Sequence, residues 1–280
     1  MDDAKKDLYG LIGILIGLAI LWYFTGGPQR PSSYSGLFLD NPQQQYTNQV
    51  SEQTQQVISG TDNSPFKGIV TIGYTSGRYE TDPQKEYIEL TASYNNKSPV
   101  RITGWTLVGK KGLDISIGQG SILAYSSQVN PQTDIYLNPG DRAYVITGQS
   151  QIGTSFKINK CTGYFTQFQT FYPYLSTDCP RPEDEDSAAN LDDQCLNYLD
   201  TLPSCRLQIS IPPALSSQCQ TYINNNVNYS KCVDFHKNDS DFYKSEWRIY
   251  LNRTEKLWKS ERETIILKDE NGKTIDSVSY

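Results

Sequence analysis

The chain has 280 residues, 37% of them hydrophobic and 12% aromatic, which is enough apolar material for a core and argues against wholesale disorder. Its formal net charge is −6 at pH 7. An acidic protein does not attract phosphate backbones by releasing counterions, so we expect no nucleic-acid partner.

The N-terminal region has the pattern of a membrane anchor. Residues 8–24 contain no charged side chain, and at ~1.5 Å per residue a helix of this length approaches the thickness of the hydrocarbon layer. Lys5 and Lys6 precede the segment, which favours a cytoplasmic N-terminus, residues 1–7, and an extracellular C-terminal domain. A cleaved signal peptide is the competing interpretation, but the sequence LWYFTGG lacks a small-x-small cleavage site. The pattern therefore predicts a single-pass membrane protein with an uncleaved transmembrane helix.

Low-complexity sequence follows the anchor and then gives way to β-type patterns. Residues 25–65 are rich in Gln, Ser, Asn and Pro, and we expect a flexible stalk. Beyond the stalk, β-branched and aromatic residues alternate with polar ones in short runs, separated by turn signals such as Pro139-Gly140-Asp141 and Asn271-Gly272. The expected strands lie in 68–74, 86–94, 100–109, 134–148, 246–251, 263–269 and 273–280. Such spacing is typical of a β-sandwich, which we expect to comprise residues 66–150 plus 245–280.

Residues 150–244 differ from both flanking blocks and predict a cysteine-rich helical insertion. Asp and Ser residues that suit helix starts open two candidate helices, 191–202 and 215–228. The acidic run 183–193 could bind calcium, but it lacks the D-x-D-x-D-G pattern and favours a solvated loop. Short C-x₂₋₄-C pairs are lacking and His236 is the one histidine, so we expect no zinc site and no other metal.

All the cysteines lie within this insertion. An even number of cysteines in an exported chain favours three disulfides in an oxidising compartment. The spacing permits many pairings, but an antiparallel hairpin of the two candidate helices makes nested bridges natural. The resulting hypothesis pairs Cys161–Cys179, Cys195–Cys232 and Cys205–Cys219.

Aromatic residues are concentrated between the first two cysteines, in residues 163–175. They either dock the insertion on the sandwich or form a partly exposed recognition patch, because large exposed apolar patches mark interaction sites. These residues are Tyr164, Phe165, Phe168, Phe171, Tyr172 and Tyr174. In residues 102–107, strand alternation favours Trp105 as a core anchor over a ligand platform, with Gly104 leaving room for the ring or for a bend.

Five short motifs, taken in order, resemble those of the lamin tail domain family. They are Glu89-Leu90, Asn95-Asn96, Gly104-Trp105-Thr106-Leu107, Leu137-Asn138-Pro139-Gly140, and Gly272 with Asp276. The resemblance implies an Ig-like β-sandwich with an interaction role and no catalytic residues. The cysteine-rich insertion departs from the ordinary domain, and the acidic charge weakens the carry-over of the DNA binding seen in some relatives.

These features favour a non-catalytic cell-surface binding or adhesion module that recognises a protein or glycan and needs no cofactor. The alternative is a structural envelope protein that self-associates, because Gly10, Gly13 and Gly17 recur at near-helical spacing and suit close helix packing. An exported hydrolase is less favoured, since His236 is the one histidine base and neither G-x-S-x-G nor H-E-x-x-H occurs.

Overall fold

The computed structural model describes Leu15, Ile16, Leu18, Leu21 and residues 63–280. The chain divides into two units, Met1–Val57 and Ile58–Tyr280, and the four described residues of the first unit are helical. The rest of the expected anchor at 8–24, its glycines and the stalk to residue 62 lie outside the described residues. Among those that are described, none belongs to a helix with both the length and the apolar character that crossing a bilayer requires.

The second unit is mainly β-sheet, as the sequence predicts, and carries three helices and three short 3₁₀ helices. A five-stranded sheet has the order β1 (Val70–Thr75), β2 (Tyr87–Ala92), β7 (Arg142–Ile146), β9 (Tyr243–Tyr250) and β8 (Phe156–Asn159). A four-stranded sheet has the order β11 (Thr274–Ser279), β10 (Thr264–Lys268), β4 (Thr106–Val108) and β5 (Asp114–Ser116). The remaining pair is β3 (Val100–Arg101) with β6 (Tyr136–Leu137).

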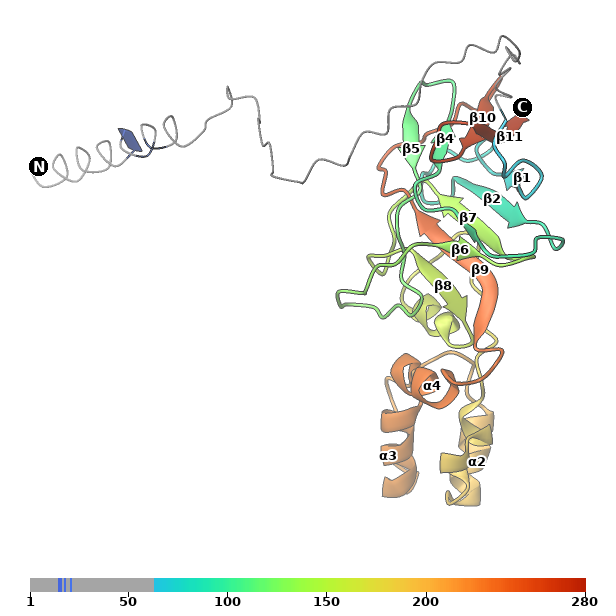
Figure 1. Cartoon of the computed structure of the whole chain (residues 1–280). Helices are drawn as coiled ribbons and strands as arrows, with labels where there is room; N and C mark the ends of the chain where they lie inside the picture. Colours follow the sequence, from blue (N-terminus) through green and yellow to red (C-terminus); the bar gives the residue numbers. More distant parts are fainter. Residues whose placement is uncertain (1–14, 17, 19–20, 22–62) are drawn as a thin grey trace, which may run out of the picture. The chain divides into compact units, whose positions relative to one another are not determined.

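Strand β9 follows the cysteine-rich segment in sequence, yet it lies inside the five-stranded sheet. It pairs in parallel with β7 and antiparallel with β8. Asn159 at the end of β8 is the ladder partner of Tyr243 at the start of β9. Residues 160–242 therefore connect two neighbouring antiparallel strands, in the way that a turn connects the strands of a hairpin. Figure 1 shows α2, α3 and α4 gathered beyond this end of the sheet.

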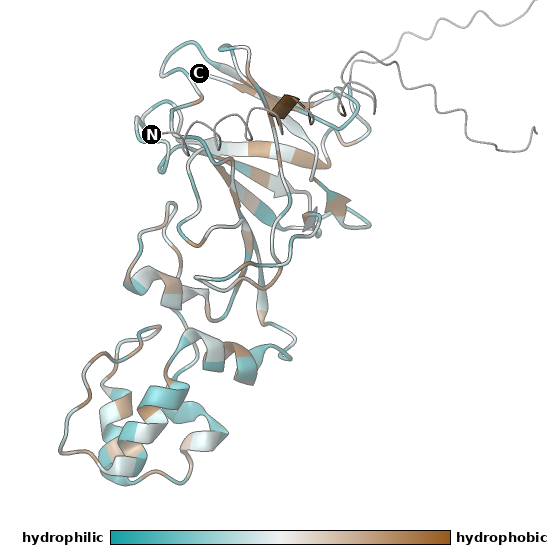
Figure 2. Ribbon diagram, turned by 90° about the vertical axis from the view of Figure 1, so that its left-hand side faces the viewer, coloured by the Kyte–Doolittle hydropathy of each residue, from teal (hydrophilic) through white to brown (hydrophobic). Residues whose placement is uncertain are grey.

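The two larger sheets share one hydrophobic core, to which their strands other than β8 contribute. Hydrophobic and hydrophilic residues alternate along the strands in Figure 2. From the five-stranded sheet come Ile88, Leu90, Ala143, Val145, Trp247 and Ile249, and from the four-stranded sheet Leu107, Ile265, Leu267 and Ile275. Trp105 is 1% exposed in this core and its ring centroid lies 5.2 Å from that of Phe66. The preceding Gly104 has a φ of +88°, and a Cβ there would meet nothing within 4 Å. The positive φ of Gly104, and not a need for space beside the Trp105 ring, therefore explains why glycine occupies this position.

Two carboxylates connect parts of the chain that are distant in sequence. Asp276 of β11 accepts a hydrogen bond from the backbone N–H of Ile72 in β1 at 2.8 Å, which joins the two sheets at one edge. Glu86, fully buried just before β2, accepts from Leu257 N at 2.7 Å, Trp258 N at 3.2 Å and Thr147 Oγ1 at 2.7 Å. Burial raises the pKa of Glu86, and these hydrogen bonds only partly offset that effect.

The helices of the insertion begin at the expected capping residues. Helix α2 (Asp193–Asp200) starts after Asp192, whose side chain accepts from Cys195 N, and α3 (Ser217–Asn226) starts after Ser216, which accepts from Cys219 N. Ser216 Oγ also donates to Asp192 Oδ2 at 2.8 Å, so the N-terminal ends of the two helices meet. The expected antiparallel hairpin is therefore wrong, because in such a hairpin the N-terminal ends of consecutive helices lie apart.

Besides the three 3₁₀ helices, two strands and one α-helix were not expected from the sequence. Strands β5 and β8 are too short to show a period of two, and β8 lies within the range 150–244 that was assigned to the insertion. Helix α4 (Tyr229–His236) begins after Asn228, which caps it by accepting from Lys231 N at 3.0 Å. Eight residues give only two turns, which is too little for a clear helical pattern.

Replacing Glu86 by Ala is expected to lower the free energy of unfolding by about 3 kcal/mol, because buried N–H donors of the β9–β10 connection lose their acceptor. Urea unfolding measures this loss. Glu89→Ala is the control, since Glu89 lies three residues further on and is half-buried, and it should change stability by less than about 0.5 kcal/mol. Equal effects of the two substitutions would contradict the role given to Glu86.

Candidate recognition surface

The structure forms three disulfides, as the cysteine count predicts, but every predicted pairing is wrong. The observed bridges are Cys161–Cys232, Cys179–Cys205 and Cys195–Cys219. Cys195 and Cys219 each lie three residues after a helix cap, and the meeting of the two caps brings them together. The pairing thus follows from the relative placement of α2 and α3, which cysteine spacing does not encode.

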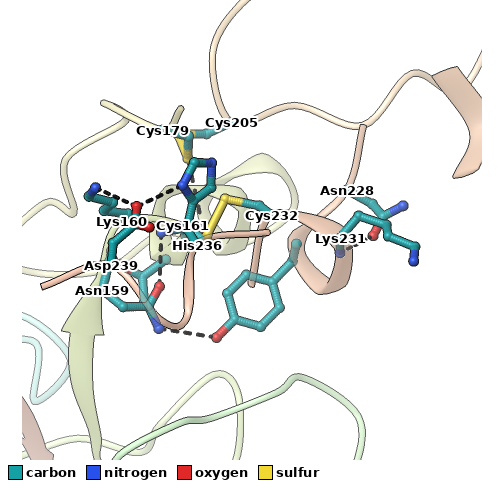
Figure 3. The surroundings of a disulfide bond; sticks show 12 residues. Asn159, Lys160, Cys161, Cys179, Cys205, Asn228, Lys231, Cys232, His236 and Asp239 are labelled. Atoms are coloured by element: carbon teal, nitrogen blue, oxygen red, sulfur yellow. Dashed lines mark hydrogen bonds and ion pairs between the residues drawn. A yellow bond between two sulfur atoms is a disulfide. The ribbon is translucent and has the colours of Figure 1, made fainter. Parts of the chain in front are cut away.

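Cys161–Cys232 fastens α4 to the end of β8 (Figure 3). Cys161 lies two residues after β8, where its N–H donates to Asn159 Oδ1 at 2.8 Å. The second bridge, Cys179–Cys205, lies beside Gly163. A Cβ at Gly163 would overlap Cys205 Sγ and lie 2.7 Å from the Ser176 carbonyl oxygen, so only glycine fits there.

The aromatic segment between Cys161 and Cys179 divides into anchoring and exposed rings. Its first part forms η1 (Thr162–Gln167). Phe165 and Phe171 are buried against Phe156 of β8, with ring centroids 5.8 and 6.1 Å away. Tyr164 is also buried, whereas Tyr172 is half-buried and Phe168 and Tyr174 are 66% and 73% exposed. The segment therefore docks on the outer face of the sheet and also presents apolar surface.

A cavity of about 190 Å³ opens beside the exposed Phe168. The Gln167 side-chain amide exchanges two 3.0 Å hydrogen bonds with the backbone of Leu207, which holds that segment next to η1. The lining residues are Ser126, Tyr164, Phe165, Phe168, Gln169, Leu207 and Tyr229. Ser126, Leu207 and Tyr229 are not predicted from sequence, because they come from separate segments without a common motif.

Arg248 of β9 holds the second exposed part of the aromatic segment. Its guanidinium donates to the backbone carbonyls of Pro173 and Tyr174, and its Nε donates to Glu246 Oε1 at 2.8 Å. The same group lies 4.7 Å from the ring centroid of Tyr144 in β7. Because Arg248 is itself buried, these contacts fix Tyr172 and Tyr174 at the border of the sheet.

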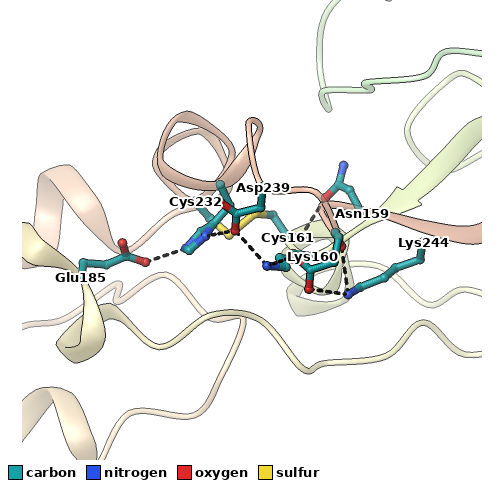
Figure 4. A network of polar contacts seen from close by, with 9 residues as sticks. Asn159, Lys160, Cys161, Glu185, Cys232, Asp239 and Lys244 are labelled. Carbon is teal, nitrogen blue, oxygen red and sulfur yellow. Dashed lines mark hydrogen bonds and ion pairs between the residues drawn. A yellow bond between two sulfur atoms is a disulfide. The ribbon is translucent and has the colours of Figure 1, made fainter.

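His236, at the end of α4, lies between two carboxylates. Its Nδ1 is 2.9 Å from Asp239 Oδ2, and its Nε2 is 2.7 Å from Glu185 Oε1, which lies between η2 (Pro182–Asp184) and η3 (Asp186–Ala188). Lys160, directly after β8, donates to the same Asp239 oxygen at 2.8 Å (Figures 3 and 4). Burial alone lowers the pKa of His236, but the hydrogen bonds to Asp239 and Glu185 outweigh it, and the pKa is raised.

The network around His236 connects three segments of the insertion: the residue after β8, the residue between η2 and η3, and the residues at and after the end of α4. Within the part of the chain that the structure describes, no group of three or more His, Cys, Asp or Glu side chains is arranged to hold a metal ion. In comparisons with known proteins, no family model and no curated protein sequence matches this chain.

The raised pKa of His236 predicts a pH-dependent stability. A charged His236 stabilises the folded insertion fully below about pH 6.5, and this contribution is lost as the pH rises through the raised folded-state pKa. His236→Gln should therefore lower the melting temperature by a few degrees at about pH 5.5 and much less at about pH 9. Lys237→Gln, at the exposed neighbouring position, is the control. An equal loss at both pH values would show that the ring acts only by packing.

Proposed function

We propose that this chain is a non-catalytic, membrane-anchored binding module of the cell surface, which recognises a protein or glycan through its β-domain and insertion. The observation that supports it best is the division of the aromatic segment. Phe165 and Phe171 anchor it in a core, while Phe168 and Tyr174 stay exposed on a backbone held by disulfides and by Arg248. Preorganised apolar groups of this kind bind with little ordering cost.

The β-domain itself is proposed to be an Ig-like sandwich of the lamin tail type. In support, the two sheets share a core, and residues of the motifs that carry the resemblance are buried in it. Leu90 and Trp105 are core residues, and Gly272 lies in the tight turn between β10 and β11. A sandwich of this type is a rigid carrier for binding loops.

The proposed location is extracellular, with residues 8–24 as the membrane anchor and residues 1–7 inside. Three disulfides support an oxidising compartment. The end of the expected stalk is attached to the β-domain, because Ser64 N donates to Thr274 O at 2.8 Å and Ser64 is buried. Ser64 therefore lies beside the start of β11.

The assignment as a non-enzyme draws support from the position of His236. Both of its ring nitrogens face carboxylates, and Lys160 shares one of them, so the imidazole is engaged in a structural ion network. General base catalysis requires a ring nitrogen that can reach a substrate proton. The buried Glu86 is likewise occupied by three donors.

The exposed rings give a direct test on the fragment Ile58–Tyr280, which is one unit of the structure. The double substitution of Phe168 and Tyr174 by Ser is expected to weaken binding to a glycan array or to whole cells at least about tenfold, with an unchanged melting temperature. Phe165→Ser is the contrasting variant. Its ring is buried, so its main effect should be a lower melting temperature.

Light scattering on the same fragment addresses the alternative of a self-associating envelope protein. A monomer that binds the array or the cells supports the proposal. A stable dimer that dissociates when Phe168 and Tyr174 are replaced would instead show that these rings contact a second copy, and the binding-module proposal would fail.

A further inference from the structure

A row of tyrosines crosses the face of the five-stranded sheet that points away from the shared core. Tyr74 of β1, Tyr87 of β2 and Tyr144 of β7 follow one another with ring centroids 5.8 and 5.5 Å apart. Their neighbours Ile88 and Val145 point into the core, as strand alternation requires. We call this row, with Glu89 of β2 and Arg142 of β7, the tyrosine face.

A bulge in β1 places Tyr74 in this row. Ile72 pairs with Leu90 and Thr75 pairs with Ile88, so two residues of β1 oppose one residue of β2. A bulge turns the strand locally and re-aims a side chain. Tyr74 remains 51% exposed, whereas Tyr87 and Tyr144 are half-buried and held by packing.

Arg248 continues the row to the aromatic segment. Its guanidinium lies over the ring of Tyr144 and donates to the carbonyls of Pro173 and Tyr174. The rings of Tyr172 and Tyr174 lie 5.1 Å apart, and Lys85 Nζ lies 5.1 Å from the Tyr172 ring centroid. The five tyrosines thus form a row of three and a pair, and the buried Arg248 side chain contacts both groups.

Charges around the five tyrosines compensate one another. Arg248 Nη2 forms an ion pair with Glu246 at 2.7 Å. Glu89 and Glu246 both act electrostatically on Arg142, and Glu80 and Asp82 act on Tyr172 beside Lys85. Three cationic side chains are therefore matched by acidic ones, and this surface offers hydrogen-bonding groups without the positive field that attracts a polyanion.

We propose that the tyrosine face, together with Tyr172 and Tyr174 of the aromatic segment, binds a neutral, soluble polysaccharide chain. Sugar rings stack their apolar C–H faces on Tyr74 and Tyr174, while their hydroxyls exchange hydrogen bonds with Glu89 and Arg142. Neighbouring tyrosine rings are inclined by 45° and 85°. Such a surface fits a twisted single chain rather than a flat crystalline one. The inference rests on the proposed binding function and names its ligand class, at a surface that shares Tyr174 with the proposed recognition surface but does not include Phe168.

Affinity electrophoresis of the full chain in mild detergent tests this proposal. The native gels contain soluble mixed-linkage β-glucan, galactomannan or xylan, with the anionic alginate as a comparison. At least one neutral polymer should retard the protein. Tyr74→Ala and Tyr174→Ala should each weaken that retardation about tenfold, because each removes an exposed stacking ring.

Tyr94→Ala is the matched control, since Tyr94 is 80% exposed in the turn after β2 and lies outside the proposed polysaccharide-binding surface. Its retardation should equal that of the unchanged protein. Tyr87→Phe keeps the ring and the fold and removes a hydroxyl that the proposal does not place against the sugar, so its retardation should also equal that of the unchanged protein. Melting temperatures establish that each variant is folded.

Three results would overturn the inference. These are retardation by alginate alone, retardation by none of the polymers, and neutral-polymer binding that survives both alanine variants. If Phe168→Ser abolishes array or cell binding while the tyrosine variants do not, the ligand binds beside η1, and the proposed function stands without this site. If neither set of variants affects any binding, both proposals fail.

Discussion

Pairing of β9 with both β7 and β8 is the constraint on which the rest of the molecule depends. The strand follows the insertion in sequence but occupies an interior position of the sheet, so the N-terminal strands cannot complete their hydrogen bonding without it. Trp247 and Ile249 of β9 also fill the shared core. Glu86 also ties the N-terminal strands to the residues after the insertion, because its buried carboxylate accepts hydrogen bonds from the backbone N–H groups of Leu257 and Trp258, which follow β9. The two sequence blocks are therefore one folding unit.

The insertion is held together by two hydrophobic clusters of its own and by a few covalent and polar links. One disulfide attaches α4 to β8, a second holds the aromatic segment beside Gly163, and a third joins the starts of α2 and α3. Arg248 adds a connection from the sheet to the backbone of Tyr174. Exposed rings on such a support keep a defined orientation, which lowers the entropy lost when a ligand binds.

Much of the β-domain could be predicted because one face of each main strand is buried, which gives Ile88-Leu90 and Ile265-Leu267 a clear alternation. The strand Phe156–Asn159 was missed since four residues carry no period. Disulfide pairing was wrong because it depends on where helix ends meet, which a contact between Asp192 and Ser216 decides. The tyrosine face was not visible either, since strand register and the bulge in β1 bring its residues together.

The pairing of Asn159 with Tyr243 means that β8 and β9 meet directly where the insertion leaves and re-enters the sheet. Since the two ends of residues 160–242 are already neighbours, lengthening, shortening or exchanging this segment leaves strand register unchanged. The helical part of the insertion can therefore change in length or sequence while β8 and β9 keep their pairing. The same geometry makes this junction a suitable graft point for engineering, where an unrelated loop could be carried on the β-domain.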